Sequence, residues 1–490
     1  MNTATLITFI IYLIGVMILG IIAYRQTHNL ADYVLGGRRL GSFVTALSAG
    51  ASDMSGWLLL GLPGALYASG LNQVWIAVGL ILGAYLNWLF VAGRLRVYTE
   101  KANNALTLPD FFHHRFQDHS NLLRIISALV ILLFFTFYTS SGLVSGARLF
   151  ENSFGLNYIT ALWIGAAVIM AYTFIGGFLA VSWTDVLQGI LMLLALIIVP
   201  IVTIYEIGGW GTVTTRISQI DPTRLDVFKD MSLLGIISLM AWGLGYFGQP
   251  HILVRFMAIK SVQEIPNARR IGMSWMIVST VGAVLTGFVG IAYFAGNPLD
   301  DPEKVFIQLS QVLFNPWVAG FLLAAILAAI MSTIDSQLLV SSTAVTEDFY
   351  QAFLRPNASQ TELMWVGRIS VVVIAVIALL IATNPKSTVL DLVGYAWAGF
   401  GSAFGPVIIF SLFWRRMTRN GALAGMVIGA VTVVVWEHFT ALKVIPFSLY
   451  EMVPAFVLSS VAIVVFSLFG KPTADFNAVN VKTDTIPKKG

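Results

Sequence analysis

Thirteen apolar runs recur along the 490 residues, most of them long enough to cross a lipid bilayer. A hydrocarbon core about 30 Å thick requires about 20 apolar residues in one helix. Because lipid offers no hydrogen-bonding solvent, each run must satisfy its own backbone as a helix. The sequence therefore predicts an all-α polytopic membrane protein with about 13 transmembrane helices. The predicted spans are Ala4–Tyr24, Phe43–Ser69, Val74–Ala92, Leu123–Phe150, Tyr158–Gly176, Ser182–Tyr205, Leu234–Phe256, Met273–Ala295, Trp317–Ala344, Val366–Thr383, Leu390–Trp414, Ala422–Val435 and Met452–Gly470.

The scarcity of charge supports this class and excludes several others. Charged residues make up 11% of the chain and hydrophobic residues 57%, whereas a soluble protein carries about 25% charged residues. A soluble enzyme, a disordered scaffold and a nucleic-acid-binding protein are excluded on this ground. The chain contains no cysteine, which excludes disulfides, a thiolate nucleophile and cysteine metal ligands.

The basic residues indicate how the spans are oriented. Of the 28 Lys and Arg, 21 fall in one set of alternating connections, and 7 fall in the other. The positive-inside rule assigns the richer set to the cytoplasm. We therefore expect the N-terminus outside, the C-terminus in the cytoplasm, one transmembrane domain over residues 1–470, and a cytoplasmic tail over 471–490.

Two of the spans contain residues that disfavour a continuous helix. The second span includes SAGASDMSG (residues 48–56), and the seventh includes AWGLGYFGQP (residues 241–250). Glycine and proline weaken helices at such positions, although one break alone is more often a packing kink. Spans 2–6 and 7–11 are consecutive blocks of five with opposite orientation, and each opens with its break. Interrupted helices at matching positions of inverted halves indicate a transporter's substrate site.

Residues near these breaks suggest an oxygen-ligand site. Ala329, Ser332 and Thr333 share one helical face in the ninth span. At 1.5 Å per residue, Ser332 lies roughly 18 Å from the inner end, level with the first break. Hydroxyls that face the carbonyls of an unwound helix suit a hard cation such as Na⁺. The alternative is that these hydroxyls bond back to their own helix.

A few ionisable and aromatic residues complete the candidate site. Asp53 is the deepest acid, about 15 Å into its span, and acids inside a membrane are functional candidates, although Asp53 could also cap the unwound helix. Asp185 lies near the cytoplasmic end of its span, where a solvated position or a position at the helix N-terminus would suffice. Trp242, Tyr246 and Tyr138 are candidates for the wall of a small-solute pocket, or for ordinary packing.

At these residues the chain resembles the solute:sodium symporter family, over nearly its whole length. The stretches that carry the resemblance are LGGRRLGSFVTALSAGASDMSGWLL, TFIGGFLAVSWTD, ISLMAWGLGYFGQPHILVRFM, ILAAIMSTIDSQLLV and GYAWAGFGSAFGPV. The resemblance, strongest to proline-transporting members, implies a five-plus-five inverted-repeat core over about 43–205 and 234–414, with further helices outside it. It also implies alternating access, with Na⁺ and L-proline as the transported pair.

The family's functional positions map onto residues of this chain. The resemblance places sodium at the carbonyls of Ala51, Met54 and Ala329 and the hydroxyls of Ser332 and Thr333. It places the substrate at Ser55, Gly56, Tyr138, Trp242, Tyr246 and Pro250. It assigns roles in coupling or in the cation path to Asp53, Arg38 and Asp185.

We therefore expect a sodium-coupled symporter of L-proline in the bacterial cytoplasmic membrane, acting as a monomer among lipids and binding no nucleic acid. The alternatives are another small amino or carboxylic acid as substrate, coupling to protons through Asp53, and a membrane sensor. About 20 residues follow the last span, too few for a signalling domain. No nucleophile–base set or metal-ligand cluster suggests an enzyme.

Overall fold

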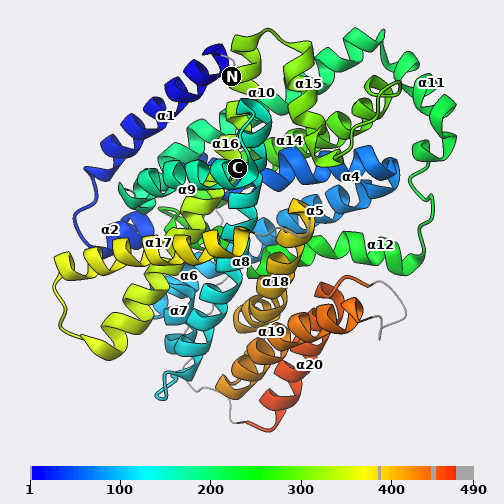
Figure 1. The fold of residues 1–490 in the computed structure, drawn as a ribbon. Helices are drawn as coiled ribbons and strands as arrows, with labels where there is room; N and C mark the ends of the chain where they lie inside the picture. The colour runs from blue at the N-terminus through cyan, green and yellow to red at the C-terminus, as the bar shows by residue number, and fades with distance from the viewer. Residues whose placement is uncertain (1–2, 176, 384–387, 443–448, 471–490) are drawn as a thin grey trace, which may run out of the picture.

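The computed structural model describes residues 3–175, 177–383, 388–442 and 449–470 (Figure 1). Most residues of this part of the chain are helical, and none of them forms a named β-strand. The principal helices are α1 (Thr3–Tyr24), α2 (Leu30–Leu35), α3 (Ser42–Asp53), α4 (Leu62–Ser69), α5 (Val74–Leu86), α6 (Ala92–Lys101), α7 (Leu108–Arg115), α8 (Leu122–Phe154), α9 (Tyr158–Ile175), α10 (Phe178–Ile207), α11 (Trp210–Ile220), α12 (Leu233–Met240), α13 (Pro250–Ala258), α14 (Ile265–Tyr293), α15 (Val305–Leu313), α16 (Pro316–Thr343), α17 (Gln360–Ala382), α18 (Val389–Phe413), α19 (Arg419–Ala441) and α20 (Met452–Leu468).

Many of these helices are apolar enough to lie in a bilayer. Among the described residues, nine continuous helical stretches have the length and composition to cross a membrane, and four shorter apolar stretches, Trp57–Ser69, Tyr158–Met170, Leu233–Gly248 and Met452–Leu468, accompany them. The peripheral helix α1 exposes Ile10, Ile14 and Ile18, which is the arrangement of a lipid-facing surface.

The predicted spans agree with these helices in position and differ at some ends. The span predicted at Ala422–Val435 was too short, because α19 runs from Arg419 to Ala441. Thr418 caps its first turn by accepting a hydrogen bond from Gly421 N, and this cap sets the start. The predicted tail, 471–490, lies outside the described residues.

The second span is interrupted, as predicted, but over fewer residues. Helix α3 continues to Asp53, Met54 leaves helical geometry at φ −83° and ψ 83°, and helical turns resume at Trp57. The residues from Ser48 to Asp53 are therefore helical, contrary to the wider break that the sequence suggested. Gly50 has a packing role here, since a Cβ at this position would lie 2.7 Å from the Trp275 ring.

The seventh span is also interrupted, and its glycines explain how. Helix α12 ends at Met240, a 3₁₀ stretch covers Ala241–Gly248, and Gln249 is extended before α13 begins. A Cβ on Gly243 would lie 2.1 Å from the carbonyl oxygen of Gly79, and one on Gly248 would lie 2.3 Å from that of Phe400. The missing side chains thus let the 3₁₀ stretch press against α5 and α18.

The two interrupted helices lie side by side and run in opposite directions. At one end, Lys260 N donates to the carbonyl of Leu40 at 2.8 Å. At the other end, the Tyr246 hydroxyl donates to Asp53. Helices α10, α14 and α16 pack around this pair, whereas α19 and α20 lie at the periphery against α18 (Figure 1). The chain therefore brings both breaks to the same level in the centre of the helical bundle.

Candidate functional site: two breaks and a hydroxyl-bearing helix

The hydroxyl face of α16 lies against the end of α3. Ser332 Oγ donates to the carbonyl of Ala51 at 2.7 Å and is 3.1 Å from that of Ala329, and Thr333 Oγ1 is 3.5 Å from the Ala51 carbonyl. All four residues are buried. Ser332 therefore contacts a carbonyl of the neighbouring helix α3 and also one of its own helix. Four predicted cation-site residues therefore form one oxygen cluster.

Met54 belongs to the same region without joining this cluster. It ends α3, and its N–H still donates to Gly50 O. Among the described residues, no group of three or more His, Asp or Glu side chains is arranged to hold a metal ion. Any cation bound here would therefore rely on carbonyl and hydroxyl oxygens, the donors that suit alkali and alkaline-earth cations.

Asp53 connects the two breaks. The Tyr246 hydroxyl donates to Asp53 Oδ2 at 2.5 Å, and the Tyr138 hydroxyl lies 3.3 Å from the Asp53 carbonyl. Trp57 Nε1 donates to the same carbonyl at 3.2 Å, so the carbonyl freed by the end of α3 gains two side-chain donors. Two of the three predicted aromatic residues thus converge on the last residue of α3.

The other predicted substrate residues lie around this centre at different distances from Asp53. Ser55 accepts a hydrogen bond from Trp57 N at 3.4 Å, and a Cβ on Gly56 would lie 2.7 Å from Ser145 Oγ. Gly56 therefore permits a close approach of the break to α8. Trp242 lies farther along the 3₁₀ stretch and stacks on Tyr450, with ring centroids 5.4 Å apart.

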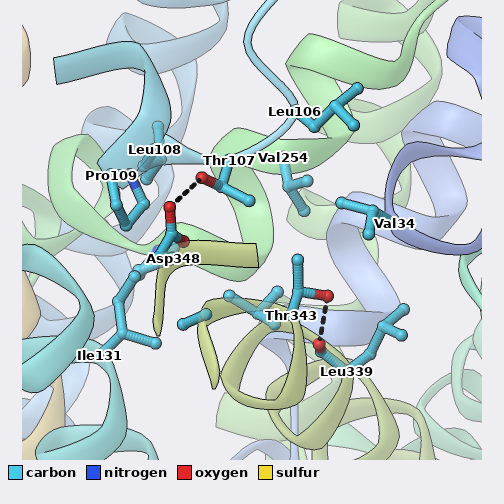
Figure 2. A pocket seen from close by; sticks show the side chains of 13 residues that line it. Val34, Leu106, Thr107, Leu108, Pro109, Ile131, Val254, Leu339, Thr343 and Asp348 are labelled. Atoms are coloured by element: carbon cyan, nitrogen blue, oxygen red, sulfur yellow. Dashed lines mark hydrogen bonds between the residues drawn. The ribbon is translucent and has the colours of Figure 1, made fainter. Parts of the chain in front are cut away.

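Pro250 faces a different cavity. It lines a small space with Val254 of α13, Leu339 of α16 and the connector that precedes α7. Figure 2 shows this space, with Thr107 Oγ1 donating to Asp348 Oδ1 at 3.2 Å across its wall. Pro250 therefore lines this space and is not among the residues that line the small cavity beside Asp53.

Asp185 is buried, so the solvated position considered from the sequence is wrong. It accepts hydrogen bonds from Ser48 Oγ at 2.7 Å and from an Arg255 guanidinium nitrogen at 3.2 Å, and neither charged side chain is exposed. Arg255 also donates to Ser336 Oγ at 2.7 Å and to the His251 carbonyl at 2.8 Å. One guanidinium thus joins α3, α10, α13 and α16.

Arg38 lies at the opposite end of α3 from Asp53. Its guanidinium donates to the carbonyls of Met257 and Ala105 at 2.6 and 2.8 Å and to Thr99 Oγ1 at 3.2 Å. Burial lowers the pKa of Arg38 to about 10, which still leaves it cationic at neutral pH. Its bond to Met257 ties the end of α13 to the segment before α3, so the geometry links Arg38 to both interrupted helices.

Three residues of this region, and Glu303 outside its centre, were not singled out from the sequence. Arg255 was counted only among the basic residues that orient the spans, and Asn87, Trp397 and Glu303 were not considered. Trp397 Nε1 donates to the Trp242 carbonyl at 2.7 Å, and Asn87 Nδ2 donates to the Tyr246 carbonyl at 2.9 Å. Each satisfies a carbonyl of the 3₁₀ stretch. The signal that could have identified Asn87 and Trp397 was a polar or hydrogen-bonding side chain inside a predicted apolar span.

Glu303 fastens two helices outside the centre. Its carboxylate accepts hydrogen bonds from Val389 N at 3.1 Å and Leu390 N at 3.2 Å, which begin α18, and pairs with Arg148 of α8. Burial raises the pKa of Glu303, although the Val389 N–H and the Arg148 charge act in the opposite direction. The carboxylate thus sits where a helix N-terminus favours negative charge.

Comparison with known proteins identifies the family. A family model described as the sodium:solute symporter family matches residues 33–429. The chain belongs to this family. The chain is 60% identical over 476 residues to the "Sodium/proline symporter" of Escherichia coli (strain K12), covering 96% of this chain and 94% of that protein. It is 57% identical over 454 residues to the "High-affinity proline transporter PutP" of Bacillus subtilis (strain 168), covering 92% and 95%.

A solved structure shares the fold at much lower identity. It is described as the substrate-bound outward-open state of a Na⁺-coupled sialic acid symporter, with a TM-score of 0.81, 17% identity, and coverage of 96% of this chain and 99% of that one. At this identity the likeness establishes the architecture alone. The helical arrangement found here therefore also occurs in that protein.

Proposed function

We propose that this chain is a sodium-coupled secondary active symporter that imports L-proline across the bacterial cytoplasmic membrane by alternating access, and that it is not an enzyme. Relatives named as proline transporters, 57–60% identical over at least 92% of the chain, support the substrate. The geometry supports the coupling ion through one observation. Ser332 and Thr333 of α16 direct their hydroxyls at the Ala51 carbonyl beside the first break.

The proposed sodium site uses the carbonyls of Ala51, Met54 and Ala329 and the hydroxyls of Ser332 and Thr333. In the described structure the two hydroxyls donate hydrogen bonds to backbone carbonyls. A hydroxyl can rotate to present a lone pair to a cation while the carbonyls do the same. Sodium would thus replace hydrogen bonds between α3 and α16 with shared coordination, and it would hold the two helices together.

The proposed substrate site is the region where the breaks meet. Ser55, Gly56, Tyr138, Tyr246 and Trp242 supply freed backbone groups and aromatic faces, which suit a small zwitterion with an apolar ring. Asp53 connects this region to the sodium cluster, because Ala51 lies two residues before it on α3. Binding of either solute would therefore order the same end of α3, which provides a physical route for coupling.

We also propose the topology that the charge distribution favours. It has thirteen spans, the N-terminus outside and the C-terminus in the cytoplasm, with inverted repeats over about 43–205 and 234–414. The nine long and four shorter apolar stretches of the described residues are compatible with this number. The antiparallel pairing of the two interrupted helices is what inverted repeats would produce. The working unit is a monomer in lipid, with Arg38 and Asp185 on the cytoplasmic path.

Uptake into proteoliposomes tests this function. Purified protein should accumulate radiolabelled L-proline when an inward Na⁺ gradient is imposed, and unlabelled proline should compete better than other small amino or carboxylic acids. Uptake that follows an imposed proton gradient and ignores Na⁺ would contradict sodium coupling. Uptake of a different solute with no competition by proline would contradict the proposed substrate.

A further inference from the structure

Two buried oxygens beside the first break are unused in the described part of the chain. Neither Asp53 Oδ1 nor Asn87 Oδ1 has a hydrogen-bond partner among the described residues, and the two residues are 2% and 1% exposed. An unpaired polar atom at such a depth costs free energy comparable to a lost hydrogen bond. Structures retain such atoms where they serve a ligand, a water molecule or an ion.

The two residues line the same cavity. This space has a volume of about 20 Å³ and is bounded by α3, α5, α13, α14 and the 3₁₀ stretch, with Asp53, Met54, Asn87 and Tyr246 among its lining residues. Such a volume holds about one water-sized group. It admits the head of an ammonium group and excludes a whole amino acid.

Tyr246 orients both the Asn87 carboxamide and the Asp53 carboxylate. Its hydroxyl donates to Asp53 Oδ2, which leaves Asp53 Oδ1 as the free oxygen, and its carbonyl accepts from Asn87 Nδ2. The amide nitrogen of Asn87 is thereby assigned, so its oxygen is the atom left over. A donor that enters this cavity therefore meets two acceptors whose orientation is set by the second break.

The number of acceptors matches one kind of donor group. The secondary ammonium of a cyclic amino acid carries two N–H donors and one positive charge, whereas a primary ammonium carries three donors. Two unpaired oxygens match the two donors of the first group, whereas the third N–H of a primary ammonium would have to share an oxygen that already takes part in the Tyr246–Asp53 hydrogen bond. A shared acceptor forms a weaker hydrogen bond, so the cavity favours a secondary ammonium.

We propose that Asp53 Oδ1 and Asn87 Oδ1 together receive the two N–H groups of the substrate's secondary ammonium, and that Asn87 is a determinant of specificity for cyclic imino acids. This inference rests on the proposed function. It adds the helical turn that directly follows α5 to the substrate site, where neither the sequence nor the family resemblance had placed a residue. It also gives the carboxylate of Asp53 a counter-charge that arrives with the substrate.

Two isosteric variants separate the acceptor of Asn87 from its donor. Asn87→Asp keeps an oxygen facing the cavity and loses the amide donor to Tyr246, and Asn87→Leu loses both while filling a similar volume. Asn72→Leu is the matched control, because Asn72 is another buried asparagine that donates to a backbone carbonyl, that of Lys229, away from this cavity. Far-UV circular dichroism and monodisperse elution verify that each variant folds.

The probes are L-proline and N-methyl-L-proline, competed against radiolabelled proline at saturating Na⁺. N-methylation removes one N–H donor and keeps the charge. The wild type, Asn87→Asp and Asn72→Leu should bind N-methyl-L-proline on the order of 10-fold more weakly than proline, the value of one charge-assisted hydrogen bond. In Asn87→Leu this ratio should fall towards one, chiefly because proline itself binds more weakly.

An unchanged ratio in Asn87→Leu would overturn the proposal. Equal losses in Asn87→Asp and Asn87→Leu would also overturn it, because Asn87 would then act only through the Tyr246 carbonyl. A variant that needs more Na⁺ with an unaltered ratio would assign the two oxygens to a cation instead. If the wild type transports with Na⁺ but does not bind proline, the proposed function fails and not merely this site.

Discussion

Arg255 offers the sharpest test of how charge is balanced inside the helical bundle. We expect Arg255→Met to destabilise the protein more than Asp185→Asn does. Arg255 and Asp185 are fully buried partners, and Asp335, also buried, interacts electrostatically with both. Neither carboxylate oxygen of Asp335 has a hydrogen-bond partner among the described residues. Two acids therefore depend on one guanidinium.

The expected magnitudes follow from this count. Removing one member of a buried ion pair costs about 3–5 kcal/mol of folding free energy. The destabilisation by Asp185→Asn should be about 3 kcal/mol, because Asp335 still balances the charge of Arg255. The destabilisation by Arg255→Met should reach about 5 kcal/mol, because this variant leaves two acids without a cation. The double variant should be more stable than Arg255→Met alone by about 1–3 kcal/mol.

Denaturant unfolding in detergent micelles, followed by far-UV circular dichroism, gives these free energies. The matched control is Arg39→Met, because Arg39 pairs with Asp32 while its side chain is 54% exposed, and an exposed pair is worth about 0–1 kcal/mol. A double variant whose loss equals the sum of the two single losses would refute the reasoning. So would an Arg255→Met protein as stable as the Arg39→Met control.

Three further substitutions test the site and its support. Ser332→Ala should raise the Na⁺ concentration for half-maximal uptake several-fold. The control Ser459→Ala, which removes a similar hydroxyl–carbonyl contact between α19 and α20, should leave this concentration unchanged. Equal Na⁺ dependence in the two variants would contradict the cation site. Trp242→Ala should weaken proline binding by 10-fold or more, because it removes about one aromatic contact and its buried area. The Na⁺ affinity should change less. Intact proline binding in this variant would place the pocket elsewhere. Glu303→Gln should lower stability by about 1–3 kcal/mol, since it weakens the pair with Arg148 and the cap of α18, and a thermal midpoint identical to the wild type would disprove this role.

Local sequence patterns were sufficient for the helices and for both interruptions. Lipid requires each apolar run to be helical, and glycine and proline act within one or two turns of their own position. The hydroxyl face of α16 was predictable for the same reason, because Ala329, Ser332 and Thr333 are neighbours on one helix. The extent of the first break was not, since Gly50 serves a contact with Trp275, 225 positions away.

Tertiary structure decided which polar groups meet. Arg255 and Asp185 are 70 positions apart, and Asn87 reaches the carbonyl of Tyr246 across 159 positions. No period or motif links such pairs. The sequence by itself determined that this chain is a helical membrane protein with two broken helices and a hydroxyl-bearing third. Only the packing of those helices decided where each buried charge finds its partner, because the partners come from segments that are far apart in the sequence.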